Sequence, residues 1–268
     1  MSFRNPCEAL TEEVMKELKK VSSTTAWGVL EKITGNPILR DSLRMMNVKP
    51  VDPSYKICGP ALTVRYIPYN PLNPDPVARK LLDEYPENIA KVTNAVKPGV
   101  VIVAAALGRV DAGVFGEGIC HGLMARGAIG VVTDGGMRDM PFIRKLKFPI
   151  FMAGNPTPTV AAYHMHEGKV AGILPTGEIN VPVVCDGVLV RAGDVIIGDE
   201  DGVIVVPLEF VEEVAKRGGA IEDIEELQRK LIVKGEYIHG QPMTRAQLEK
   251  YGMLEKWKIA YPDRPIPE

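Results

Sequence analysis

An apolar segment that runs into a pair of glycines constrains the fold of this chain more than any other feature. Residues 129–133 have the short, apolar, partly β-branched composition of a buried strand, and Gly135 and Gly136 follow closely. A cation and a carboxylate, Arg138 and Asp139, come directly after this turn region. The end of a buried strand followed by a glycine turn is a place where a rigid sheet can hold charged groups against a ligand. The pattern therefore predicts a sheet that carries a functional turn at one edge.

Apolar strand-like runs alternate with helical patterns through the first 154 residues. We expect strands at 59–67, 100–106, 129–133 and 149–154, and helices at 8–21, 25–34, 118–126 and 140–146. This alternation is typical of an α/β fold with some parallel strand pairing. Residues 68–86 begin with a stretch rich in Pro and Asn and continue with a helical pattern. They predict an insertion that leaves the main fold.

Short β-type runs replace this alternation in the second half of the chain. They occupy 169–174, 181–185, 188–190, 195–198 and 202–206, with turn pairs such as Asp-Gly between them. The close spacing predicts a compact meander or barrel-like sheet packed on the same core. Two amphipathic helices are expected after it, at 208–234 with a break at Gly218-Gly219, and at 244–257.

The composition is that of a globular protein with no strong charge bias. Apolar residues make up 46% of the chain, charged residues make up 25%, and the net charge is −2. This charge gives no electrostatic reason to expect nucleic acid or an anionic membrane as a partner. The first residues lack a signal-peptide core, and no apolar run reaches the roughly 18 residues that span a bilayer. We therefore expect a cytoplasmic protein that binds neither nucleic acid nor membrane.

The cysteines point to packing rather than to metal binding. Four cysteines are present, and they form no C-x-x-C pair: Cys7, Cys58, Cys120 and Cys185. Buried free thiols explain them better than a zinc site. Cys120 lies near Glu117 in sequence, but its spacing alone does not indicate a nucleophile.

The histidines and one acidic cluster are weak candidates for a site. His164 and His166 would share a face as metal ligands only on a strand, and the preceding residues are at least as typical of a helix. His121, four residues after Glu117, would be either a proton carrier or an ordinary polar residue of a helix. The acidic cluster at 199–201 lacks calcium-loop spacing and is typical of a turn between strands.

Glu117 and the Arg138-Asp139 pair are the residues best suited to chemistry. Arg138 can clamp a carboxylate through two parallel hydrogen bonds, and Asp139 can hold a hard divalent cation through oxygen. Glu117 lies at the start of a predicted helix, where the N–H groups of Gly118 and Ile119 are free to bind an anion. The alternatives are a carboxylate that merely favours a helix N-terminus and a surface ion pair contributing about 0–1 kcal/mol. The apolar strand and the glycines around the pair favour a functional site.

The chain resembles the family that contains the regulator of ribonuclease activity A and 4-hydroxy-4-methyl-2-oxoglutarate aldolase, termed the RraA-like family below. The family pattern of an acid, twenty residues and then Arg-Asp is matched by Glu117 and Arg138-Asp139. The order and spacing agree from about residue 20 to 236. Further matching segments lie at 59–65, 127–135, 179–185, 193–195 and 201–207.

This resemblance implies a fold and an activity. The fold would be a compact α/β/β arrangement related to swivelling domains, with helical N- and C-terminal extensions. One RraA-like domain would span 1–268, with a core at about 20–236, an insertion at about 68–90 and a C-terminal extension at about 240–268. The activity would be that of a class II pyruvate aldolase, a lyase that uses Mg²⁺ or Mn²⁺. It would release pyruvate from a 4-hydroxy-2-oxo acid such as 4-hydroxy-4-methyl-2-oxoglutarate and would also decarboxylate oxaloacetate.

The resemblance also implies roles for individual residues. Asp139 would coordinate the metal, Arg138 would bind the pyruvyl unit and stabilise its enolate, and Glu117 would act on the metal through water. The backbone around Gly116, Gly118 and Ile119 would hold the substrate carboxylate. Homotrimers or homohexamers would place sites between subunits, and a glutamate of the neighbouring C-terminal helix, here Glu222 or Glu225, would complete each site.

Two other functions stay open from the sequence. One is a non-catalytic protein that binds a ribonuclease as a regulator. The other is a related lyase or hydratase acting on a keto acid derived from a sugar acid, which the same site residues would serve. The complete acid and Arg-Asp set favours an enzyme, whereas the insertion and the extension leave the substrate undecided.

Overall fold

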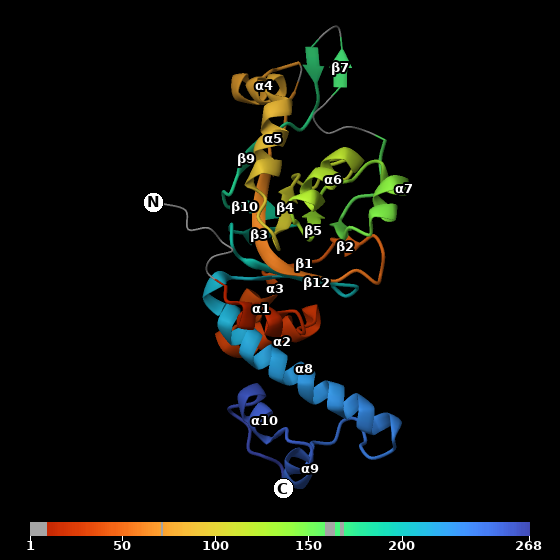
Figure 1. Cartoon of the computed structure of the whole chain (residues 1–268). Coiled ribbons are helices and arrows are strands. Elements are labelled where there is room, and N and C mark those ends of the chain that lie inside the picture. The colour runs from red at the N-terminus through yellow and green to blue at the C-terminus, as the bar shows by residue number, and fades with distance from the viewer. Residues whose placement is uncertain (1–9, 71, 159–163, 167–168) are drawn as a thin grey trace.

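The computed structural model describes residues 10–70, 72–158, 164–166 and 169–268, arranged around a nine-stranded sheet (Figure 1). Eight strands follow the order β1-β13-β12-β3-β4-β5-β6-β2, and β9 pairs with β3. Their bounds are β1 Arg44–Met45, β2 Lys49–Pro50, β3 Ile57–Tyr66, β4 Val101–Ala105, β5 Gly130–Thr133, β6 Ile150–Met152, β9 Thr176–Ile179, β12 Val195–Asp199 and β13 Gly202–Val206. The predicted α/β class is confirmed.

Four of these strands form the parallel centre of the sheet. β3, β4, β5 and β6 are parallel neighbours, and every residue of β4, β5 and β6 is buried. Burial on both faces explains why their sequences are nearly continuous apolar runs. Helices connect them: α4 Pro76–Asp83, α5 Tyr85–Ala95, α6 Glu117–Ala125, α7 Met140–Ile143 and the 3₁₀ turn η2 Arg144–Leu146. Because parallel strands end at the same edge, the loops after β4 and β5 meet there.

A second, helical half packs beneath the β12–β13 side of the sheet (Figure 1). It contains α1 Glu12–Leu18, α2 Ser23–Thr34, α3 Pro37–Asp41, η3 Leu208–Phe210, α8 Val211–Val233, α9 Arg245–Lys250 and α10 Leu254–Ala260. Buried residues such as Leu30, Ile197 and Ile224 join these helices to the sheet. None of the helices within the described ranges is long and apolar enough to cross a membrane.

The expected break in the long C-terminal helix is wrong. α8 is continuous through Gly218 and Gly219. A Cβ at Gly218 would lie 2.9 Å from Val21 Cγ2, and one at Gly219 would lie 2.4 Å from Glu17 Oε2. The two glycines therefore let α1 and the residues just after it pack closely against α8, and this tertiary contact outweighs their poor helix propensity.

The single helix expected at 244–257 is also wrong, because two helices occupy this stretch. α9 begins at a capping box formed by Thr244 and Gln247. It ends before Gly252, whose φ of 68° lies in the left-handed region that terminates helices. Met253 N then donates to Leu248 O at 2.7 Å, and α10 begins.

The short strands of the second half do not form a meander of their own. β7 His164–His166 pairs with β8 Lys169–Ala171, and β10 Val183–Cys185 pairs with β11 Val188–Val190, whereas β9, β12 and β13 join the main sheet. His164 and His166 therefore lie on a strand, but their side chains are outside the described part of the chain, as are Cys7 and the first two residues of the helix expected at 8–21.

Candidate active site

Asp134, the residue after β5, fixes the start of the turn that carries the candidate site. It is 4% exposed, and its carboxylate accepts N–H groups from Ala106 at 2.5 Å, Gly108 at 2.9 Å and Asp186 at 3.3 Å. Three donors compensate a buried charge that would otherwise be costly. Asp134 thus ties the ends of β4 and β5 to the β10–β11 hairpin. Sequence reasoning missed this role, although an acid directly after a buried strand is a usable signal.

The glycines after Asp134 let residues 136–138 run beside residues 112–115. Gly136 N donates to Ala112 O at 3.0 Å, and Val114 N donates to Gly136 O at 2.9 Å. A Cβ at Gly136 would lie 2.8 Å from the carbonyl oxygen of Val110, so a larger residue does not fit. Arg138 N continues the pairing by donating to Phe115 O at 3.1 Å. This pairing delivers Arg138 and Asp139 to the N-terminus of α6.

The Asp139 carboxylate links the Arg138 side chain to the start of α6. Its Oδ2 accepts from Arg138 Nε at 3.0 Å and from the backbone N–H of Glu117 at 3.3 Å. Gly116, the N-cap of α6, has no side chain to cap the helix, and a Cβ there would lie 2.4 Å from Asp139 Oδ2. Asp139 itself has a left-handed backbone with φ of 59°. The structure therefore brings Gly116, Glu117, Arg138 and Asp139 together.

Glu117 and His121 add two titratable groups to the same helix end. Their side chains are 40% and 48% exposed, and His121 Nδ1 lies 3.9 Å from Glu117 Oε1. Nδ1 also lies 3.1 Å from the Glu117 carbonyl oxygen, which can only accept, so Nδ1 carries the proton of that contact. In a neutral ring, Nε2 is then left as the proton acceptor. The N–H groups of Gly118 and Ile119 belong to the first turn, where an α-helix supplies no partners of its own.

Cys120 contributes packing rather than chemistry. The residue is buried, and burial, with a smaller effect of Asp139, raises the pKa of its thiol to about 12. A thiol with that pKa is protonated near neutral pH and is a poor nucleophile.

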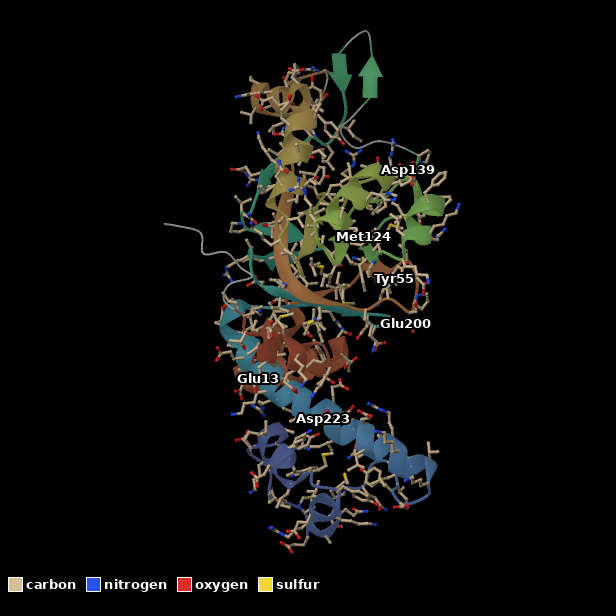
Figure 2. All side chains as sticks on the ribbon, viewed as in Figure 1. Glu13, Tyr55, Met124, Asp139, Glu200 and Asp223 are labelled. Atoms are coloured by element: carbon tan, nitrogen blue, oxygen red, sulfur yellow. The ribbon has the colours of Figure 1, made fainter. Side chains whose placement is uncertain are left out.

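Glu222 and Glu225 lie on α8, in the half of the molecule away from the site. Figure 2 labels Asp223, their neighbour in sequence, far below Asp139. Glu222 Oε1 accepts from Ser22 N at 3.0 Å and from Thr25 Oγ1 at 2.7 Å, so this carboxylate already holds the N-terminus of α2. Glu225 is more open: 43% of its side chain is exposed, and its Oε2 lies 3.6 Å from Arg229 Nη1. Within one chain neither glutamate meets Asp139.

The carboxylates at the site suit a cation that keeps most of its water. Among the described residues, no three His, Cys, Asp or Glu side chains converge as a metal cage. Mg²⁺ is commonly held by one or two carboxylates with several waters, and Asp139 with Glu117 matches that number. Asp139 Oδ1 accepts no hydrogen bond from the described residues, which leaves one oxygen available to a cation. The residues present therefore fit a divalent metal of this kind.

A cavity of about 590 Å³ opens beside Asp134, between the loop after β4 and the β10–β11 hairpin. Three of its lining side chains are apolar and about half exposed: Leu107 at 52%, Val110 at 48% and Val184 at 55%. Large apolar side chains clustered at a surface are typical of a binding face.

Comparison with known proteins identifies the family. The RraA-like model, described as Aldolase/RraA, matches residues 30–205. A Halalkalibacterium halodurans protein with the provisional name 4-hydroxy-4-methyl-2-oxoglutarate aldolase is 32% identical over 185 residues, which cover 69% of this chain and 76% of that protein. Protein DlpA of Legionella pneumophila is 29% identical over 71% of this chain, although the match spans only 28% of DlpA.

A solved structure agrees with these sequence matches. Streptomyces coelicolor RraAS2, described as an unusual member of the RNase ES inhibitor RraA family, superimposes with a TM-score of 0.64 at 28% identity. The superposition covers 82% of this chain and 98% of RraAS2. With the family model matching more than half of its length, the chain belongs to the RraA-like family.

Proposed function

We propose that this protein is a divalent-metal-dependent lyase that cleaves a 4-hydroxy-2-oxo acid, such as 4-hydroxy-4-methyl-2-oxoglutarate, to pyruvate and also decarboxylates oxaloacetate. The observation that carries the proposal is the contact of Arg138 and Asp139 with the N-terminus of α6. Both reactions break a carbon–carbon bond and leave negative charge on a keto oxygen. An arginine, a free carboxylate oxygen and helix N–H groups at one point are suited to binding an α-keto acid with a metal.

Asp139, assisted by Glu117, would hold Mg²⁺ or Mn²⁺. When bound, the metal would supply Lewis-acid stabilisation of the charge on the keto oxygen. Arg138 adds fixed positive charge at the same place, and its side chain is 37% exposed, so a substrate can reach it. The N–H groups of Gly118 and Ile119 would orient the substrate carboxylate at the positive end of α6.

The reaction also needs a base for the proton of the substrate hydroxyl. Glu117 is suited to this because it is the first residue of α6, the helix end proposed to bind the substrate. The neutral imidazole of His121 can take the proton from Glu117 only at Nε2, through a bridging water, because its Nδ1 already carries a proton that faces the Glu117 carbonyl oxygen.

A third carboxylate would come from a neighbouring copy of the chain. The exposed apolar side chains beside Asp134 support assembly, because a self-association surface would cover them. Glu225 is the better donor of the two candidates, since Glu222 is already engaged in capping α2. We therefore include a homotrimer or homohexamer in the proposal.

The first test is release of pyruvate from oxaloacetate and from 4-hydroxy-4-methyl-2-oxoglutarate with Mg²⁺, with Mn²⁺ and with EDTA. Turnover should require metal and should fall by at least 100-fold in Arg138→Ala and Asp139→Ala. Mn²⁺ binding, followed by electron paramagnetic resonance without substrate, should weaken in Asp139→Ala but persist in Arg138→Ala. Wild-type turnover in either variant would refute the assignment.

Mixing inactive variants tests the shared site. If Glu225 serves a neighbouring subunit, Asp139→Ala and Glu225→Ala should each be inactive alone and should recover activity when refolded or exchanged together. Mixed oligomers then contain some sites with neither substitution. No recovery, with light scattering confirming mixed oligomers, would place all catalytic groups within one chain.

The likeness to RraAS2 supports one alternative, a non-catalytic regulator that binds a ribonuclease. That function predicts no metal-dependent release of pyruvate and direct inhibition of a purified RNase E-type enzyme. Inhibition that survives in Asp139→Ala, together with no turnover of either keto acid, would favour the regulator.

A further inference from the structure

A small cavity lies where the start of α2 meets β1 and the turn between β12 and β13. Its volume is about 170 Å³. The lining includes an aromatic ring, a cation, a carboxylate, a hydroxyl group and an apolar side chain: Trp27, Arg44, Asp201, Thr24 and Ile204. Figure 2 labels Glu200, which precedes Asp201 in the chain and does not line the cavity, well below Asp139. The cavity is therefore separate from the candidate active site.

The charge of Arg44 has no partner within the described part of the chain. The residue is partly buried, its Nε is sealed from solvent, and its side chain makes no hydrogen bond or ion pair there. Its guanidinium carbon lies 5.8 Å from the centre of the Trp27 ring, which attracts a cation but supplies no oxygen acceptor. A buried N–H group without an acceptor is costly, and the cavity is the place from which an oxyanion can reach this guanidinium.

The acids on the neighbouring elements already hold other groups. Arg40 lies over the same tryptophan ring, 3.7 Å from its centre, and is paired with two acids. Its Nη1 lies 2.7 Å from Glu31 Oε2, and its Nε lies 3.2 Å from Asp41 Oδ1. Asp199, at the end of β12, accepts hydrogen bonds from Ser23 N at 2.8 Å and from Ser23 Oγ at 2.6 Å. These acids therefore leave the guanidinium of the cavity without an ion pair.

Asp201 places a carboxylate in the same cavity on a fixed backbone. Its N–H donates to Asp199 Oδ1 at 3.1 Å, and its carbonyl oxygen accepts from Lys49 Nζ at 2.5 Å. The carboxylate accepts a hydrogen bond from Thr24 Oγ1 at 3.2 Å and forms no ion pair with a described residue. A cation and a carboxylate thus line one small cavity without pairing with each other.

We propose that this cavity binds a small zwitterion that carries a carboxylate and an ammonium group, as an α-amino acid does. The planar guanidinium of Arg44 presents paired N–H groups that match the two oxygens of a carboxylate. The ammonium group of the ligand binds Asp201, and its apolar part lies against Trp27 and Ile204. A ligand with a single charge would leave one of the two charged side chains without a partner, so the cavity selects a zwitterion.

Titration calorimetry with each standard amino acid tests this inference. We expect saturable binding of at least one of them and a rise in melting temperature with its concentration. Analogues that lack one charge should bind about tenfold more weakly or worse; for valine these are isovalerate, without the ammonium group, and isobutylamine, without the carboxylate. Absence of saturable binding by every amino acid would overturn the proposal. Equal binding of a single-charge analogue would also overturn it.

Two substitutions separate recognition of each charge from a general structural effect. Arg44→Gln should weaken binding of the amino acid about tenfold and leave the amine analogue unaffected, whereas Asp201→Asn should weaken the amino acid and leave the carboxylate analogue unaffected. Arg40→Gln is the matched control, because it removes a cation from the same ring but outside the cavity, and it should bind as the wild type does. Equal weakening in Arg40→Gln and Arg44→Gln, or loss of both analogues in either cavity variant, would contradict the assignment.

Discussion

Replacing Gly116 by Ala tests whether the contact between the α6 N-terminus and the Arg138-Asp139 pair is functional. An added Cβ would lie 2.4 Å from Asp139 Oδ2 and 2.9 Å from Arg138 Nε, where ordinary contacts begin at 3.4 Å. The two side chains must therefore move by about 1 Å. A displacement of that size at a catalytic group costs on the order of 100-fold in rate, about 2.7 kcal/mol.

Stability should change much less than activity in Gly116→Ala. The backbone at Gly116 is extended, with φ of −118°, and alanine adopts it without strain. Arg138 and Asp139 are 37% and 34% exposed, so both side chains can swing toward solvent at a cost of about 1 kcal/mol or less.

The assay is kcat/KM for metal-dependent pyruvate release, measured beside a thermal melt. Gly122→Ala is the matched control, because its Cβ on the same helix would meet only Thr93 Cγ2 at an ordinary 3.5 Å. A Gly116→Ala enzyme with wild-type kcat/KM would refute the reasoning. An equal loss in both variants would show that α6 responds to any added methyl group.

The remaining predictions concern packing and ionisation. Gly218→Ala should lower the unfolding free energy by about 1–3 kcal/mol in denaturant titrations, because its Cβ would lie 2.9 Å from the buried, rigid Val21. Gly219→Ala should cost less, since its nearest neighbour is the mobile end of a surface glutamate, and an equal cost would contradict the packing explanation. Burial and a neighbouring glutamate raise the pKa of Glu225, so its ionisation destabilises the fold as pH rises above about 4.5. Glu225→Gln should therefore melt above the wild type at pH 7, with the difference vanishing below pH 4.5; a constant difference would argue against this cause. Cys120, with a pKa of about 12, should resist iodoacetamide at pH 8 until urea unfolds the protein, and rapid labelling of the native state would contradict its burial.

The proximity of Glu117 to Arg138 and Asp139 was predictable, because the features that produce it are local in sequence. An apolar strand, a glycine turn and a glycine-flanked helix start are each visible within about ten residues, and parallel pairing brings their ends to one edge. The bond from Asp139 to the N–H of Glu117 follows from that arrangement. The role of Asp134 was not predictable in the same way, because its three donors come from two distant loops.

The errors arose where tertiary contacts override local preference. Gly218 and Gly219 are poor helix formers, yet α1 and Val21 approach α8 so closely at these positions that a side chain would meet them. Gly252 divides 244–257 through its left-handed backbone, which a search for helical periodicity does not detect. The short strands between 169 and 206 have the alternation of apolar residues that is typical of strands. This alternation does not specify which strands pair, and several of these strands pair with strands that are distant in sequence.

The backbone of Asp139 shows what the site requires of the chain. Its φ of 59° lies in a region that glycine adopts freely and that residues with side chains occupy at a cost of order 1 kcal/mol. Glycine at this position would relieve that backbone cost, but it would remove the carboxylate that accepts hydrogen bonds from Arg138 Nε and from the N–H of Glu117. The carboxylate therefore stands on a backbone conformation that glycine would adopt more readily, and its two hydrogen bonds offset part of that cost. Asp139→Gly would keep the turn conformation and remove the proposed metal ligand in a single substitution.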